Sequence, residues 1–256
     1  MTFEADKNEL YNWQQVCQPD IIFFSGYNHI IETDRLSDVK HGLYNIHFGP
    51  LPQFRGPSPV FWQLRTGQKE VGLVIHKMTQ KLDQGAVVWE QKITNQPYFN
   101  YEFLNRVFGE QQCKGVIAVL DLLNAGKQPI EKIQDENNAA YYNLPQLKDV
   151  IIDWENMEAE EILDLIKACN PWNFGATTIL NGAEVRILDA VIKTGNNGSH
   201  QPGKVLNVGD EMLVACRNNK SIAIFFFRIN GSFAPARYAR NFGIGAGQFF
   251  KTVTLQ

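Results

Sequence analysis

The stretch Tyr44–Gly85 determines how the rest of the chain is interpreted. It begins YNIHFGPLPQFRGPSP (residues 44–59) and closes KLDQG (residues 81–85). Asn45 and His47 stand two residues apart in an extended pattern, so on a strand their side chains would share one face. The prolines that follow cannot pair in a central strand and predict a stiff, extended loop. With Asp83, the stretch supplies an amide, an imidazole and a carboxylate in an otherwise apolar segment.

These three groups would divide the work of acyl transfer if they met in space. An amide donates to an oxygen that develops negative charge, and an imidazole moves protons near neutral pH. An aspartate orients the imidazole, favours its charged form or fixes a water. No Ser or Cys stands in an evident nucleophile elbow, so direct attack by an amine fits better than a covalent acyl-enzyme. The residues alone leave structural roles open: a strand edge for Asn45 and His47, a turn for Asp83, packing for His76.

Outside this stretch, the first half of the chain alternates strand and helix patterns. Residues 6–17 predict a helix capped by Asp6, and residues 100–124 predict the longest one. Residues 21–24, an apolar run, are typical of a strand buried on both faces. The Ser25-Gly26 break then places a loop at the carboxyl end of that strand, where ligands bind in open α/β sheets. The alternation predicts an α/β domain.

The second half changes character after a polar segment, residues 134–146, which we interpret as a linker. Residues 159–169 predict an amphipathic helix. Short extended runs separated by turn signals follow it, at residues 176–180, 185–192, 204–208, 212–216 and 221–228. Five such strands predict a small β-barrel. We therefore predict two domains: residues 1–145, and residues 150–256 with the helix leading.

Composition narrows the class of protein. The chain has 256 residues, 44% of them hydrophobic, and no apolar run approaches the ~18 residues of a membrane span. The first twenty residues lack a signal-peptide pattern, which predicts a cytoplasmic protein. The four cysteines form no CxxC pair and are expected to be buried thiols. From Lys167 onward, ten Lys or Arg stand against four Asp or Glu, a net charge of +6 within a chain of net −3. This asymmetry suggests two units with different roles, and the basic half is compatible with either a polyanionic partner or a chance surface charge.

The central stretch resembles the folate-dependent formyltransferase family. The motifs that carry the resemblance are Asn45-Ile46-His47, Leu51-Pro52 with Arg55-Gly56, Gly72 with His76, and Asp83-Gln84-Gly85. The resemblance implies N10-formyltetrahydrofolate as co-substrate and no metal. Asn45 would then hold the formyl oxygen, His47 would handle the proton of the attacking amine, and Asp83 would position His47 or a water. Residues expected near the pterin, mainly through their backbone, are Phe24, Ser25, Gly26, Tyr27, Leu82, Gln84 and Gly85.

The second half is similar to the C-terminal barrel of the methionyl-tRNA formyltransferase branch of that family. Its matching motifs include Ile152-Asp153-Trp154, Asn170-Pro171-Trp172 and residues 202–205. The resemblance implies a partial Rossmann-like formyltransferase domain followed by an OB-like barrel, with an aminoacyl-tRNA as the amine. The alternatives are an amino sugar attached to a nucleotide, formyl-folate hydrolysis, or a non-catalytic folate-binding module.

The chain departs from the family pattern in two places. Phe48-Gly49-Pro50 stands where the family usually has a serine and a second leucine. Family members also carry further strands and helices before the equivalent of residues 21–24. We expect a shortened reading frame, a homodimer over the bare sheet edge, or a partner chain that replaces the missing half.

Overall fold

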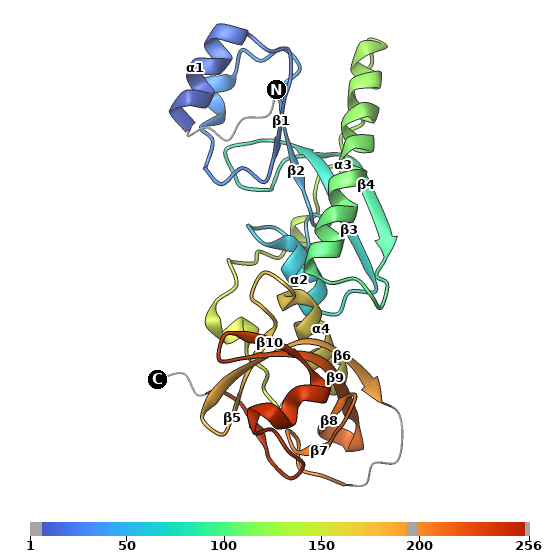
Figure 1. The fold of residues 1–256 in the computed structure, drawn as a ribbon. Coiled ribbons are helices and arrows are strands. Elements are labelled where there is room, and N and C mark those ends of the chain that lie inside the picture. Colours follow the sequence, from blue (N-terminus) through green and yellow to red (C-terminus); the bar gives the residue numbers. More distant parts are fainter. Residues whose placement is uncertain (1–6, 194–198, 254–256) are drawn as a thin grey trace. The chain divides into compact units, whose positions relative to one another are not determined.

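The computed structural model describes residues 7–193 and 199–253, which fall into two compact units (Figure 1). The first unit contains residues 1–59, 69–95 and 105–144, and the second contains residues 60–68, 96–104 and 145–256. The predicted capping residue, Asp6, lies outside the described residues. No helix in residues 7–193 and 199–253 combines the length and the apolar character needed to cross a membrane.

The first unit is built on a mixed four-stranded sheet. Its strands are β1 (Ile22–Ser25), β2 (Leu43–His47), β3 (Glu70–Lys77) and β4 (Val87–Thr94), in the order β1-β2-β3-β4. β1 runs parallel to β2, whereas β2, β3 and β4 pair antiparallel. Its helices are α1 (Lys7–Cys17), the short η1 (Thr33–Leu36) and η2 (Glu136–Asn138), and most of α3 (Tyr101–Asn124).

β1 differs from the predicted strand because it lies at an edge and is buried on one side only. Ile22 and Phe24 are buried in a cluster with Leu10, Tyr11 and Leu36, while Ser25 is exposed. Only β2 pairs with β1 among the described strands, so one edge has no strand beside it. An apolar run of four residues cannot by itself distinguish this arrangement from a central strand.

Gly115 explains why α3 can lie close to the sheet. A Cβ at this position would approach ring carbon Cε3 of Trp89 to 2.6 Å and Cδ1 of Ile75 to 2.8 Å. Real side-chain carbons do not come so close, so a glycine here lets the helix backbone approach β3 and β4. The other glycine within the helix, Gly109, has no atom within 4 Å of the equivalent position. α3 is continuous through both glycines.

We expect Gly115→Ala to lower the free energy of unfolding by about 1–3 kcal/mol, because the added methyl overpacks the Trp89 ring. Gly109→Ala is the matched control in the same helix and should raise it by about 0.4–1 kcal/mol, since alanine has less backbone entropy to lose. Urea unfolding of the two variants measures both effects. Equal stabilisation by both substitutions would contradict the close approach at Gly115.

The second unit is built on a curled antiparallel sheet, preceded by α4 (Ala159–Cys169). Its strands are β5 (Ala176–Leu180), β6 (Ala183–Lys193), β7 (Val205–Val208), β8 (Met212–Ala215), β9 (Ser221–Ile229), β10 (Ser232–Pro235) and β11 (Phe250–Lys251). The order is β11-β5-β6-β9-β8-β7, with β10 on β9. The remaining helices are most of α2 (Pro59–Arg65), and the short η3 (Leu147–Val150), η4 (Arg217–Asn219) and η5 (Ala236–Phe242). The five predicted strands are present, and β10 and β11 are additional.

Trp154 is the largest fully buried side chain of this unit. Its ring is 1% exposed, stacks on Phe250 with centroids 5.7 Å apart, and donates from Nε1 to Thr178 Oγ1 at 2.9 Å. The sheet curls so that its edges meet: Phe250 N donates to Gly203 O, and Val205 N donates to Gln248 O, both at 2.8 Å. A partnered indole N–H lets so large a ring be fully buried.

The cysteines differ in part from the expectation of four buried thiols. Cys169 and Cys216 are buried, and burial raises the pKa of each thiol to about 12. Cys17 and Cys113 are exposed, since each lies on a helix face that is turned away from the core.

Candidate active site

Pairing of β2 with β3 places the first polar side chains of the site. Asn45 lies opposite His76 in the antiparallel register, and His47 lies opposite Val74. Because Asn45 and His47 are two residues apart on β2, they face the same side of the sheet. His47 and His76 are both buried, with ring centroids 6.4 Å apart.

Asp83 joins this group from the loop that follows β3. Its Oδ1 lies 3.4 Å from Asn45 Nδ2, 3.5 Å from His76 Nε2 and 3.8 Å from His47 Nδ1. Its Oδ2 accepts from the backbone N–H of Gly56 at 2.9 Å. The carboxylate is 5% exposed, and its residue adopts a left-handed backbone conformation with φ of 55°. One buried carboxylate oxygen is therefore the point where the three other side chains converge.

Backbone carbonyls decide which ring nitrogens carry protons. His47 Nε2 lies 2.6 Å from Phe54 O, and His76 Nδ1 lies 2.8 Å from Lys77 O. A carbonyl oxygen only accepts, so both of these nitrogens must donate. In neutral His47 the lone pair therefore sits on Nδ1, the nitrogen nearest Asp83. In neutral His76 it sits on Nε2, which can accept from Asn45 Nδ2 at 3.2 Å.

The electrostatics of the site keep His47 neutral and Asp83 charged near pH 7. Burial lowers the pKa of His47, and the raising effects of the Asp83 charge and the Phe54 carbonyl do not overcome it. For Asp83, burial opposes ionisation, but contacts with His76 and His47 in their protonated forms and the hydrogen bond from the Gly56 N–H together lower its pKa. The 3.8 Å contact between His47 and Asp83 becomes an ion pair only when His47 takes up a proton.

The residues predicted to line a folate pocket lie at the end of β1 and in the loop that contains Asp83. Phe24 is buried in the core and can offer only backbone to a ligand. Ser25 Oγ donates to Gln112 Oε1 at 2.8 Å, and Gly26 has φ of 61°. Tyr27 is partly buried against the same core cluster as Phe24.

In the loop, Leu82 and Gln84 are exposed, while Gly85 is buried. A Cβ on Gly85 would lie 1.7 Å from Lys77 O, so no other residue fits this position without moving the loop. The loop therefore follows β3 closely and presents Asp83 toward β2.

Sequence patterns miss the main-chain groups of this site. Phe54 O and Gly56 N both come from the proline-rich loop, and they hold His47 and Asp83 through hydrogen bonds. The sequence also missed Gln134, which lies in the segment interpreted as a linker. It is 8% exposed and donates to Asp83 O and Gly85 O. Among the described residues, no group of three or more His, Cys, Asp or Glu side chains could hold a metal ion.

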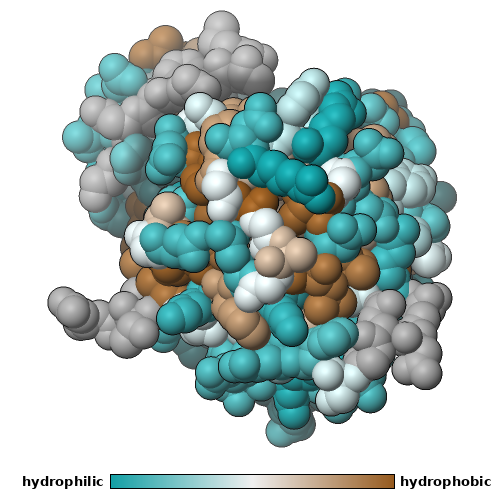
Figure 2. All heavy atoms as spheres, turned by 60° about the horizontal axis from the view of Figure 1, so that its bottom comes forward, coloured by the Kyte–Doolittle hydropathy of each residue, from teal (hydrophilic) through white to brown (hydrophobic). Residues whose placement is uncertain are grey.

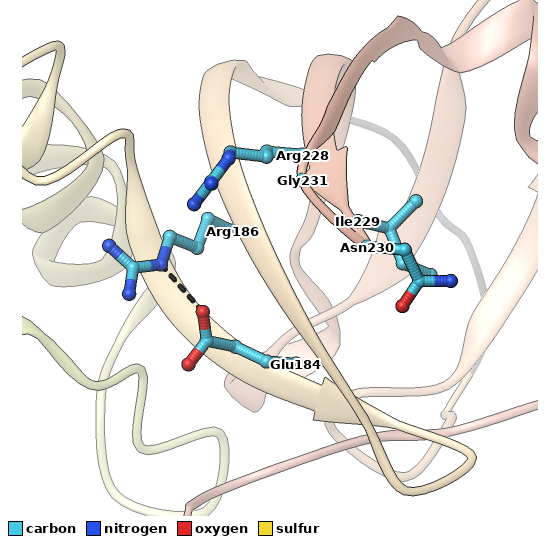
Figure 3. A pocket seen from close by; sticks show the side chains of 6 residues that line it. All are labelled: Glu184, Arg186, Arg228, Ile229, Asn230 and Gly231. Carbon is cyan, nitrogen blue, oxygen red and sulfur yellow. Dashed lines mark hydrogen bonds and ion pairs between the residues drawn. The ribbon is translucent and has the colours of Figure 1, made fainter.

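A hollow lies on the curled sheet of the second unit (Figure 3). It has a volume of about 190 Å³ and is lined by Glu184, Arg186 and residues 228–231. Arg186 and Arg228 are directly opposite on β6 and β9, and their side chains extend side by side in Figure 3.

The two arginines of this hollow differ in their partners. Arg186 pairs with Glu184 at 2.8 Å. The Arg228 guanidinium lies 4.9 Å from the Phe174 ring and 5.6 Å from the Phe233 ring, and its Nε is buried without a hydrogen-bond partner.

The face of this unit brought forward in Figure 2 is mainly hydrophilic, with apolar side chains gathered near its centre.

Together, the mixed sheet with its buried Asn, His and Asp side chains and the curled antiparallel sheet define a two-part α/β protein. Residues 3–120 match the family model of formyl transferases, and residues 146–232 match that of the formyl transferase C-terminal domain. A methionyl-tRNA formyltransferase of Nitrosomonas europaea is 30% identical over 241 residues, which make up 93% of this chain and 74% of that protein. The chain belongs to the formyl transferase family.

Solved structures share the fold. HypX from Aquifex aeolicus, in complex with tetrahydrofolic acid, has a TM-score of 0.71 at 20% identity, over 94% of this chain and 41% of that one. WlaRD, a sugar 3N-formyl transferase solved with dTDP and 5-N-formyl-THF, has a TM-score of 0.61 at 17% identity, over 83% of this chain and 73% of that one. The chain spans 62%, 65% and 74% of the length of three curated relatives that it matches.

Proposed function

We propose that this protein transfers a formyl group from N10-formyltetrahydrofolate to the primary amine of an aminoacyl-tRNA. The observation that carries the proposal is the convergence of Asn45, His47 and His76 on one buried oxygen of Asp83. Family membership supports the reaction class, and relatives named methionyl-tRNA formyltransferase support the amine. The donor set fits the co-substrate: a neutral imidazole nitrogen and a primary amide lie on one face of β2.

His47 acts as the base in this proposal. Formyl transfer forms a bond between the amine nitrogen and the formyl carbon, breaks the bond from that carbon to N10, and moves one proton from the amine to N10. Nδ1 of His47 takes the proton because Nε2–H is committed to Phe54 O. The Asp83 carboxylate, 3.8 Å away, stabilises the imidazolium while it holds the proton. The bound co-substrate supplies an activated formyl group.

Asn45 donates to the formyl oxygen as negative charge develops there. Its Nδ2 has two hydrogens, and Asp83 Oδ1 and His76 Nε2 are the partners of that nitrogen. Binding a formyl oxygen therefore requires one of these two contacts to be exchanged. Phe24, Ser25, Gly26, Tyr27, Leu82, Gln84 and Gly85 form the folate site, mainly through their backbone groups.

Incubation with N10-formyltetrahydrofolate and candidate amines, followed by mass spectrometry, tests the proposal. Formylated methionyl-tRNA is the expected product. Formylation of a dTDP-linked amino sugar instead would support the second candidate, which the shared fold with WlaRD favours. Formate release without an amine would indicate hydrolysis. Folate binding without formation of any product would indicate that the protein is a non-catalytic folate-binding module.

Arg228 is proposed to contact the tRNA backbone, because its guanidinium has no ion-pair partner among the described residues and lies beside two aromatic rings. We expect Arg228→Ala to reduce by about one the slope of log affinity against log salt concentration for tRNA. Arg217→Ala is the control, since Glu158 already neutralises that charge at 3.2 Å. An unchanged slope for Arg228→Ala, measured by filter binding, would contradict this contact.

We propose domain limits of 1–145 and 150–256 and an OB-like barrel for the second, supported by the hydrogen bonds that join its sheet edges. The free edge of β1 supports a homodimer, which sedimentation would detect. A cytoplasmic location stays a prediction.

A further inference from the structure

Residues 134–144 of the segment interpreted from sequence as a linker are part of the first unit. They run beside the proline-rich loop, with Ala140 N donating to Pro52 O at 3.1 Å and Tyr142 N donating to Arg55 O at 2.8 Å. The Tyr142 ring stacks on the Phe54 ring, with centroids 5.5 Å apart. Residues 134–142 are therefore fixed against the loop that contributes Phe54 O and Gly56 N to the active site.

Gln134 links this segment to the Asp83 loop. Its Nε2 donates to Asp83 O and to Gly85 O, each at 2.7 Å. Both amide hydrogens of Gln134 are therefore donated to main-chain carbonyls, one before and one after Gln84. Because Gln134 is 8% exposed, water cannot easily replace these hydrogen bonds.

Arg55 determines the orientation of the Gln134 amide. Its Nε and Nη2 donate to Gln134 Oε1 at 3.2 and 2.9 Å. A guanidinium has only donors, so the oxygen of the amide must face Arg55 and its nitrogen must face the loop. Arg55 is 5% exposed, and its charge is balanced by two hydrogen bonds to Glu136, at 3.0 and 2.7 Å.

These contacts hold Asp83 from two sides. Gln134 fixes its main chain, and the N–H of Gly56, the residue after Arg55, fixes Oδ2 of its side chain. Oδ1 is thereby left to face His47, His76 and Asn45. We propose that Gln134, oriented by Arg55, is a positioning residue that sets the distance from the Asp83 carboxylate to His47.

The catalytic meaning of this inference rests on the proposed formyl transfer, whereas the positioning itself can be measured without any reaction. In Gln134→Leu the new side chain has nearly the same volume as glutamine but forms none of the hydrogen bonds that Gln134 makes to Arg55, Asp83 O and Gly85 O. We expect its kcat for formyl transfer to fall roughly tenfold to a hundredfold, because a misplaced catalytic group mainly costs turnover.

NMR supplies a readout that a general loss of stability would not change in the folded protein. As the carboxylate moves from His47, the pKa of that imidazole should fall further, since the Asp83 charge raises it. The amide resonance of Gly56 should also shift as its hydrogen bond to Oδ2 weakens. Gln248→Leu is the matched control: this glutamine also bridges two main-chain groups, Gly243 O and Gly245 N, but lies in the second unit.

Arg55→Lys provides a second variant in case Gln134→Leu does not fold. It keeps the charge and loses the fork that orients the amide, so smaller changes in the same direction are expected. Folded variants with wild-type kcat, His47 pKa and Gly56 amide shift would overturn the proposal, as would a lower kcat with both NMR signals unchanged. If the wild type formylates no amine, the proposed function fails, and the NMR measurements still decide the positioning role.

Discussion

Asp83→Asn is expected to lower the turnover of formyl transfer by roughly 10²–10⁴-fold, the usual contribution of a positioned acid–base group. Asparagine keeps the size of the side chain but removes the charge that faces His47 Nδ1 at 3.8 Å and His76 Nε2 at 3.5 Å. A neutral amide cannot stabilise the imidazolium that forms when His47 takes the proton. Steady-state kinetics with N10-formyltetrahydrofolate and methionyl-tRNA measures the fall in turnover.

Folate affinity should remain within about threefold in this variant, because the proposed pterin contacts of the loop are main-chain groups. Titration of tetrahydrofolate by calorimetry is the control. Loss of folate binding with an unchanged turnover at saturation would contradict the role given to Asp83.

The same substitution has an expected signature in stability. The pKa of Asp83 is lower in the folded protein than its usual value near 4. Its ionisation therefore contributes stability above that usual pKa, and the contribution is lost as pH falls toward the folded value. Asp83→Asn lacks this titration, so its free energy of unfolding should depend less steeply on pH in that acidic range.

His47→Ala is the second change with a large expected effect, again a fall in turnover of roughly 10²–10⁴-fold. Burial lowers the pKa of His47 below its usual value near 6.5. Its neutral, proton-accepting form therefore persists below pH 6.5, and we expect the kcat/KM profile of the wild type to decline only at more acidic pH. In His47→Ala this acid limb should disappear together with most of the activity.

Identical product formation by the wild type and His47→Ala would refute the role of His47 as base. Asp83→Asn provides a further check, because removing the carboxylate removes a contribution that raises the pKa of His47. The imidazole should then titrate at still lower pH, which NMR can follow even where turnover is too slow to measure.

Local sequence predicted most elements of the fold. Residues 100–124 were expected to be helical, and α3 spans Tyr101–Asn124. The amphipathic helix Ala159–Cys169 was predicted with its observed limits, as were the approximate positions of β5 to β9. These elements depend on periodicity, capping and turn residues, which act over a few positions. β10 and β11 were missed because both are short and take their stability from pairing with β9 and β5.

The candidate site was predictable only in part for the same reason. The spacing of Asn45 and His47 placed both on one face of β2, and the family resemblance linked them to Asp83. No pattern indicated Phe54 O or Gly56 N, since main-chain groups have no residue identity. Gln134 was also missed, because a polar residue in a polar segment is typical of a linker.

By itself, therefore, the sequence determined the types of chemical groups, the order of the strands and helices and the two-part division of the charge. Only the tertiary structure decided which groups meet. Asp83 Oδ1 faces His47 because Gly56, Arg55 and Gln134, far apart along the chain, hold its loop from two sides. Such a geometry arises from backbone hydrogen bonds and burial across distant segments, and neither is encoded in any local run of residues.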